Sequence, residues 1–169
     1  MRERAMVTIN DFQGIITAYH KETDRAAAIL AAEFANEYLA GFMQSFMVSD
    51  SKCAELFAEM APLGAFAARA HVAHAFGLIT SEIAADLRYV RKIRNVFAHD
   101  ISVDLSFSTP QVKDLCANFS MVQPILQAEG GEYLQTNPRN QYLVTIGIAV
   151  MHMHSKRLAH EKELQARDA

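Results

Sequence analysis

The chain has 169 residues, enough for one domain with a hydrophobic core that needs no disulfide or metal to hold it. Its formal net charge is -3, so the totals give no sign of the strongly basic face that holds a protein on DNA. Hydrophobic residues make up 51% and charged residues 21%, as in ordinary soluble globular proteins. We therefore expect one domain over 1–169 and no sequence-specific binding to duplex DNA.

The composition favours helices and a reducing compartment. Only 7 glycines and 4 prolines interrupt the chain, and the abundant alanine, leucine and glutamate lose little side-chain freedom in a helix. Cys53 and Cys116 lack C-x-x-C spacing, which predicts free thiols. No apolar core of the kind found in signal peptides follows Met1-Arg-Glu-Arg, so we expect no signal peptide, and the apolar runs at 26–30 and 142–151 are too short for a bilayer. We expect a cytoplasmic protein without membrane contact.

The first part of the chain predicts three helices. One follows Thr8, with Asp11 suiting the positive end of a helix dipole. A longer helix over about 24–48 has an apolar stripe so broad that we expect it to face two neighbours. A short helix is predicted at about 53–60.

The middle of the chain predicts two helices separated by a glycine. The Pro-Leu-Gly sequence at 62–64 marks a turn before a helix over about 65–76. Gly77 is the residue type expected to end that helix. The next helix covers about 81–98, because Thr80 and the residues after it form a capping sequence.

The remaining chain predicts a loop and two more helices. Residues 101–108 alternate apolar and polar side chains, but a lone strand cannot pair its edges, so a loop is favoured. Pro110 suits the first turn of a helix, and 128–140 is a polar connection with two glycines. The last helix covers about 138–165, within which a charged tail begins near 155. The whole pattern predicts an all-α bundle of six or seven helices.

A polar group stands at the end of the predicted helix 81–98. Arg94, Asn95 and His99 form an Arg-Asn-x-x-x-His sequence. Arg94 shares a face with apolar residues, so it either meets an acid or a phosphate inside a cleft or extends past the edge of the core into solvent. Asn95 and His99 are four residues apart and can touch, whereas Arg94 and His99 flank a groove.

This group allows two interpretations. An arginine can hold a phosphate and a histidine can relay a proton, which suits metal-independent cleavage of RNA. In the structural alternative, His99 binds the last helix carbonyls and Arg94 pairs with an acid such as Asp86 or Asp100. The spacing alone favours the structural interpretation.

The segment 61–100 resembles the core of the mannitol operon repressor (MtlR) family. The matching residues are Pro62-Leu63-Gly64, Arg69, Gly77-Leu78-Ile79, Asp86-Leu87, Ile93-Arg94-Asn95 and Phe97-Ala98-His99. The resemblance implies control of sugar-uptake genes, with the phosphocarrier of the sugar phosphotransferase system as a possible protein partner. No helix-turn-helix with a basic recognition helix is evident. The binding residues that we expect on this basis are Arg69, Arg91, Arg94, His99 and Asp100.

The Arg94-to-His99 spacing also resembles the Arg-x4–6-His motif of HEPN domains. These are helical bundles, typically dimeric, that include metal-independent ribonucleases and many inactive members. The resemblance would make Arg94, Asn95 and His99 catalytic residues and RNA a partner. Four basic residues on one helix more often form a solvated face, however. Whether the chain is an enzyme stays open, and the regulator is the favoured interpretation.

Other features predict assembly but no cofactor. The apolar stripes at 29–46 and 142–151 exceed what one bundle face needs, which predicts a homodimer or larger oligomer. The pair His71 and His74 lacks further metal ligands nearby, and His152 and His154 point in different directions on one helix. No nucleotide-binding, serine-hydrolase or metalloprotease motif occurs.

Overall fold

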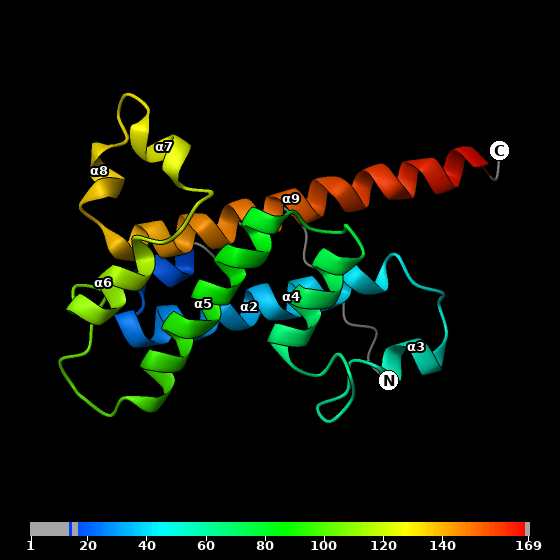
Figure 1. The fold of residues 1–169 in the computed structure, drawn as a ribbon, viewed down its shortest axis with the longest axis horizontal. Coiled ribbons are helices and arrows are strands. Elements are labelled where there is room, and N and C mark those ends of the chain that lie inside the picture. Colours follow the sequence, from blue (N-terminus) through cyan, green and yellow to red (C-terminus); the bar gives the residue numbers. More distant parts are fainter. Residues whose placement is uncertain (1–13, 15–16, 168–169) are drawn as a thin grey trace.

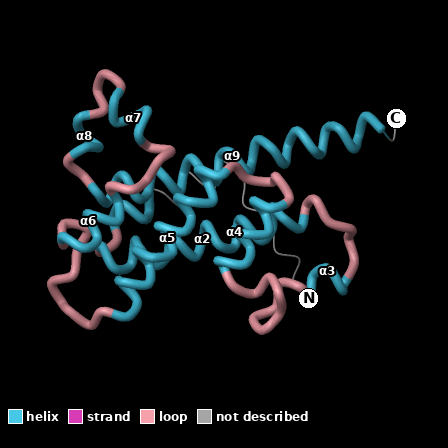
Figure 2. Tube along the Cα trace, in the orientation of Figure 1, coloured by secondary structure: helices cyan, strands magenta, loops and turns pink. Residues whose placement is uncertain are grey.

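The computed structural model describes Gly14 and residues 17–167 (Figure 1). In this part of the chain every regular element is a helix, and Figure 2 shows helices joined only by loops. The predicted all-α bundle is therefore confirmed. The helices are α2 (Asp24–Gln44), α3 (Ser51–Glu55), α4 (Phe66–Ala75), α5 (Ser81–His99), α6 (Pro110–Cys116), α7 (Gln123–Gln127), α8 (Glu132–Gln135) and α9 (Pro138–Arg167).

The two longest helices, α2 and α9, lie side by side and run in the same direction (Figure 1). Near their first turns the Tyr142 hydroxyl donates to the Ala28 carbonyl at 2.7 Å. Near their last shared turns the His160 ring stacks on Phe46, with the ring centroids 4.3 Å apart. Because parallel neighbours cannot be joined by a short turn, helices α3 to α8 lie between them in sequence, and α5 packs against both.

Small side chains on α2 and large rings elsewhere build the core. The inner face of α2 is alanine at five fully or almost fully buried positions, which lets neighbouring helices approach closely: Ala27, Ala28, Ala31, Ala32 and Ala35. Aromatic rings from α5, the following loop and α9 fill the centre of the core. The ring centroid of Phe107 lies 5.0 Å from that of Phe97 and 5.3 Å from that of Tyr142. Burial raises the pKa of the Tyr142 hydroxyl well above its usual value.

Arg69 is a buried connector between helices. Its Nε donates to the Leu63 carbonyl at 2.7 Å and its Nη1 to Asn36 Oδ1 at 2.9 Å. Glu37 lies 3.6 Å away and supplies the opposite charge. Only 5% of Arg69 is exposed. The guanidinium therefore ties α4 and the 62–64 turn to α2, and this burial speaks against the binding role expected from the sequence.

Asp86 is the acidic counterpart and is completely buried in α5. Its carboxylate accepts hydrogen bonds from the Ser120 backbone N–H at 2.9 Å, the Ser120 hydroxyl at 3.0 Å and the Met121 N–H at 2.9 Å. These bonds hold the segment after α6 against α5. The hypothesis that Asp86 pairs with Arg94 is wrong, because both carboxylate oxygens bind the 120–121 segment.

Two glycines hold turns that other residues would strain. Gly77 has φ of +65°, and the N–H groups of Gly77 and Leu78 donate to the carbonyls of His74 and Ala73. This pattern ends α4 as the sequence predicted. Gly64 is confined differently, since an added Cβ would lie 2.3 Å from the Glu59 carbonyl oxygen.

The structure differs from the sequence prediction mainly at helix ends and in one connection. α2 ends at Gln44 rather than near Val48, and α3 is shorter and begins earlier. The connection between α6 and α9 contains α7 and α8, which were missed because helices of four or five residues show no periodicity. Most of the first predicted helix, which follows Thr8, lies outside the described residues. The part that is described, Gly14 and residues 17–21, is helical. None of the helices in the described part is long and apolar enough to span a membrane.

We predict that Asp86→Ala lowers the free energy of unfolding by about 3 kcal/mol, because buried backbone donors at 120 and 121 lose their acceptor. Urea unfolding measures this change as a lower midpoint at an unchanged slope. The exposed Asp104→Ala is the matched control, with an expected change within about 0.5 kcal/mol. Equal midpoints for the two variants would contradict the role assigned to Asp86.

Candidate functional site

Helix α5 carries the polar group that the sequence singled out. The Thr80 hydroxyl accepts from the Ile83 N–H at 3.4 Å and caps the helix start. Its inner face buries Ile83, Leu87, Val90, Ile93 and Phe97. This packing orients the whole helix, so its opposite face is turned to solvent.

The α5 outer face consists of Arg88, Lys92, Asn95 and His99. The spacing of four, three and four residues aligns these side chains along the helix. Arg88 and Lys92 lie over the Tyr89 ring, at 5.3 and 5.1 Å from its centroid. The sequence between Asp86 and Asp100 has no acidic residue. The outer face is thus locally basic although the chain has a net negative charge.

Arg94 lies on a flank of α5 rather than on the outer face. It is half-buried, and its side chain makes no hydrogen bond or ion pair with another described residue. Burial raises the pKa of the Tyr142 hydroxyl, and the positive charge of Arg94 lowers it by a smaller amount. Because α5 continues through His99, the Arg94 and His99 side chains leave the helix in directions about 140° apart. The helix therefore does not stack this pair, while Asn95 and His99 share the outer face.

The end of α5 is held by Arg25 of α2. The guanidinium donates to the carbonyls of Phe97, Asp100 and Ser102, the last two at 2.7 and 2.8 Å. His99 is exposed, and its imidazole makes no hydrogen bond in the described part of the chain. The hypothesis that His99 satisfies the last helix carbonyls is therefore wrong, and Arg25 has this role.

Asp24, the residue before Arg25, connects the loop after α5 to the start of α9. Its Oδ1 accepts from Arg139 Nη1 at 2.7 Å and its Oδ2 from the Phe107 N–H at 2.9 Å. Arg139 also donates to the Tyr19 and Glu22 carbonyls. Sequence reasoning missed these residues, since an Asp-Arg pair at a helix start gives no sign of its distant partners.

The 100–109 loop displays two apolar side chains. Ile101 and Val103 are each 96% exposed, although the Asp100 carboxylate accepts from the Ser102 N–H at 2.7 Å. Leu105 and Phe107 are buried further along the loop. The loop is therefore fixed at both ends, while its tip places two exposed apolar side chains directly after the α5 outer face.

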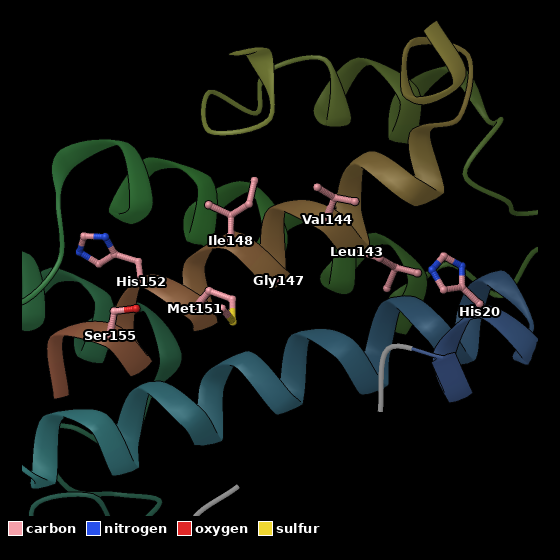
Figure 3. A pocket seen from close by; sticks show the side chains of 8 residues that line it. All are labelled: His20, Leu143, Val144, Gly147, Ile148, Met151, His152 and Ser155. Atoms are coloured by element: carbon pink, nitrogen blue, oxygen red, sulfur yellow. The ribbon is translucent and has the colours of Figure 1, made fainter. Parts of the chain in front are cut away.

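A second feature is an apolar groove along α9, with a volume of about 590 Å³. Figure 3 shows Val144, Ile148 and Met151 along its length, with His20 at one end and His152 and Ser155 at the other. Burial and then the nearby Lys156 lower the pKa of His152, which favours the neutral form of its imidazole. The walls of the groove are mostly apolar, and sequence reasoning had noted only the apolar run 142–151.

The histidines outside α5 show no metal site. No group of three potential His, Cys, Asp or Glu ligands occurs within Gly14 and 17–167. His154 Nδ1 hydrogen-bonds the Tyr38 hydroxyl at 3.1 Å, and His74 Nδ1 lies 3.4 Å from the Ile79 carbonyl. These two imidazoles have contacts within the bundle.

Comparison with known proteins gives a fold but no family. No protein-family model and no curated protein matches the chain. The fold is similar to a chain in the X-ray structure of the MtlR-HPr complex from Escherichia coli, with a TM-score of 0.65 and 17% identity. The match covers 84% of this chain and 98% of that chain. The helical fold expected from the resemblance of 61–100 is confirmed, and at this identity the likeness extends to the fold alone.

We predict that Arg25→Ala loosens the 100–109 loop and lowers the free energy of unfolding by about 2 kcal/mol, since three carbonyls lose a charged donor. Amide hydrogen exchange should become faster at residues 100–106 before it changes in the α9 core. Arg91→Ala is the control, because the Arg91 side chain makes no hydrogen bond or ion pair within 17–167. Unchanged exchange in the loop would contradict the anchoring role.

Proposed function

We propose that this protein is a cytoplasmic regulator of sugar uptake that resembles the mannitol operon repressor and acts through protein contacts. Its partner is a phosphocarrier of the sugar phosphotransferase system. The supporting observation is the fold likeness to a chain of the MtlR-HPr complex, which extends over 84% of this chain. The residues that resemble the repressor family lie within that fold, on α4 and α5 and in the turns before them.

The partner surface that we propose joins the α5 outer face to the tip of the 100–109 loop. Ile101 and Val103 would serve as apolar anchors, and Arg91 and His99 would flank them with polar contacts. A loop held by Arg25 and Asp24 loses little conformational freedom on binding. Rigid apolar side chains at the centre of an interface often carry most of its binding energy.

Transcriptional control would then pass through proteins rather than through direct reading of DNA. The outer face offers two full positive charges, Arg88 and Lys92, both of which lie over the Tyr89 ring. Specific DNA recognition needs several phosphate contacts together with side chains that reach base edges. This surface suits an acidic patch on a protein better than a duplex.

We predict that the protein binds the purified phosphocarrier and that the Ile101→Asp/Val103→Asp double variant binds it at least tenfold more weakly. The expected loss follows from placing charges where apolar anchors are proposed. Isothermal titration calorimetry measures the dissociation constants. Val48→Asp is a matched control, because Val48 is also an exposed apolar residue, at 78%.

All three proteins should melt at the same temperature, since none of these side chains is buried. Absence of binding by the wild type would remove the phosphocarrier as partner. Binding that is unchanged in the double variant would instead remove the proposed surface.

The alternative function is a metal-independent ribonuclease or its inactive remnant. It is kept because Arg94, Asn95 and His99 are all at least partly exposed, and their side chains make no hydrogen bond or ion pair with other described residues. Against it stands their arrangement, since one helix directs Arg94 and His99 to different sides. A cleavage site would need a second molecule or the RNA itself to bring them together.

We predict no cleavage of single-stranded RNA by the wild type in metal-free buffer. Gel analysis of a labelled oligonucleotide tests this, with Arg94→Ala and His99→Ala as comparison variants. Cleavage that is lost in both variants at unchanged melting temperature would establish the ribonuclease instead.

A further inference from the structure

Helix α5 has a polar flank that makes no side-chain bonds within the bundle, which we call the arginine flank. It occupies the i, i+3, i+4 and i+7 positions of one stripe and consists of Arg91, Arg94, Asn95 and Ala98. The first three residues are half-buried, and their side chains make no hydrogen bond or ion pair with another described residue. Ala98 is exposed and carries only a methyl group, so the space beside the three polar side chains stays open to solvent.

The surroundings of Arg94 place the arginine flank where α5 crosses α2 (Figure 1). Besides burial, which raises the pKa of the Tyr142 hydroxyl, the positive charge of Arg94 acts on this group from nearby. That hydroxyl donates to the Ala28 carbonyl of α2 at 2.7 Å. Arg25 of α2 adds another guanidinium at the end of the flank, where it is bound to carbonyls at the end of α5. Three arginines thus gather at the junction of α2 and α5.

No acid in the described part of the chain forms an ion pair with the arginine flank. The sequence has no acidic residue between Asp86 and Asp100, and these two carboxylates accept hydrogen bonds from backbone N–H groups. On α2, Asp24 pairs with Arg139, and the Glu33 carboxylate accepts from a side-chain amide of its own helix at 3.3 Å. A half-buried guanidinium without a counter-charge has lost hydration and gained no partner, which favours an anion from outside the chain.

We propose that the arginine flank binds the phosphate group of a small phosphate monoester. Each guanidinium offers two parallel N–H donors that match two phosphate oxygens. Two such groups together with the Asn95 amide suit a tetrahedral group of charge about −2 better than a singly charged carboxylate. The three donors span about 6 Å along the helix, which is the size of one phosphate group. The flank shares Arg91 with the proposed partner surface, but phosphate binding needs no phosphocarrier.

Arg25 removes an obstacle to an anion at this end of α5. The last carbonyls of a helix carry partial negative charge and repel anions. The Arg25 guanidinium donates to the carbonyls of Phe97, Asp100 and Ser102. It therefore offsets this negative charge next to Ala98 and adds a positive charge of its own. A phosphate beside the flank would face guanidinium groups rather than unpaired carbonyl oxygens.

Titration with methyl phosphate, followed by NMR, tests the site. The side-chain N–H signals of Arg91, Arg94 and Asn95 should shift to saturation. Methyl sulfate, a singly charged ester of the same shape, should bind about fivefold more weakly. Methyl phosphate should lose this advantage below about pH 6, because a monoester then takes up a proton. Shifts that do not saturate, equal binding of methyl sulfate, or tighter binding of acetate would overturn the proposal.

Matched variants separate the site from the general charge of the helix. Arg91→Gln and Arg94→Gln should each weaken the binding of methyl phosphate about tenfold. Arg88→Gln removes the same charge from the exposed outer face of the same helix and should change the dissociation constant less than about twofold. Arg94→Lys keeps the charge but loses the two parallel donors, so it should bind with intermediate affinity and replaces Arg94→Gln if that protein does not fold. Equal weakening in Arg88→Gln and Arg91→Gln would show a diffuse charge effect and overturn the site.

A phosphoserine peptide tests whether the phosphate comes from a small molecule. If the flank recognises the phosphate group alone, the peptide should bind within about twofold of methyl phosphate. Binding of the peptide more than about tenfold tighter would show that contacts beyond the phosphate matter. That result would overturn the assignment to a small ester in favour of a phosphorylated protein.

Discussion

The junction at the start of α2 holds together parts of the chain that are far apart in sequence. Asp24 binds Arg139 at the start of α9 and the Phe107 backbone in the loop after α5. The next residue, Arg25, binds the carbonyls at the end of α5. Two adjacent side chains thus connect α2, α5 and α9, and each makes charge-assisted bonds in a partly buried setting where they are strong.

This junction has a direct consequence for function. The tip of the loop after α5 carries the exposed apolar side chains of Ile101 and Val103, yet Arg25 fixes the start of this loop. A surface that is both exposed and rigid suits recognition of a protein partner, since little freedom is lost on binding. Because Arg25 donates hydrogen bonds to the carbonyls at the end of α5, these carbonyls do not need the imidazole of His99, which is exposed on the outer face.

The residues that carry the resemblance to the repressor family divide into two groups. Gly64, Arg69, Gly77 and Asp86 have structural roles in this chain, as tight turns or buried polar connectors. They explain why the resemblance predicted the fold. The side chains of Arg94, Asn95 and His99 make no hydrogen bond to other described residues, so packing of the bundle does not depend on such bonds. Any function that the resemblance implies must therefore be tested on this second group and the loop beside it.

Much of the secondary structure was determined by the sequence alone. Local signals predicted α4, α5, α6 and α9 within a few residues, because they act directly on the backbone. These signals are the helical composition, the capping sequence at Thr80, the helix-ending Gly77, and Pro110 in the first turn of a helix. What the sequence could not decide was which partner each polar side chain takes. Asp86 binds 120–121 rather than Arg94, Arg69 is buried, and Arg25 caps α5 across more than seventy residues. Such pairings depend on which helices pack together, and helix packing is a property of the whole chain rather than of any local pattern.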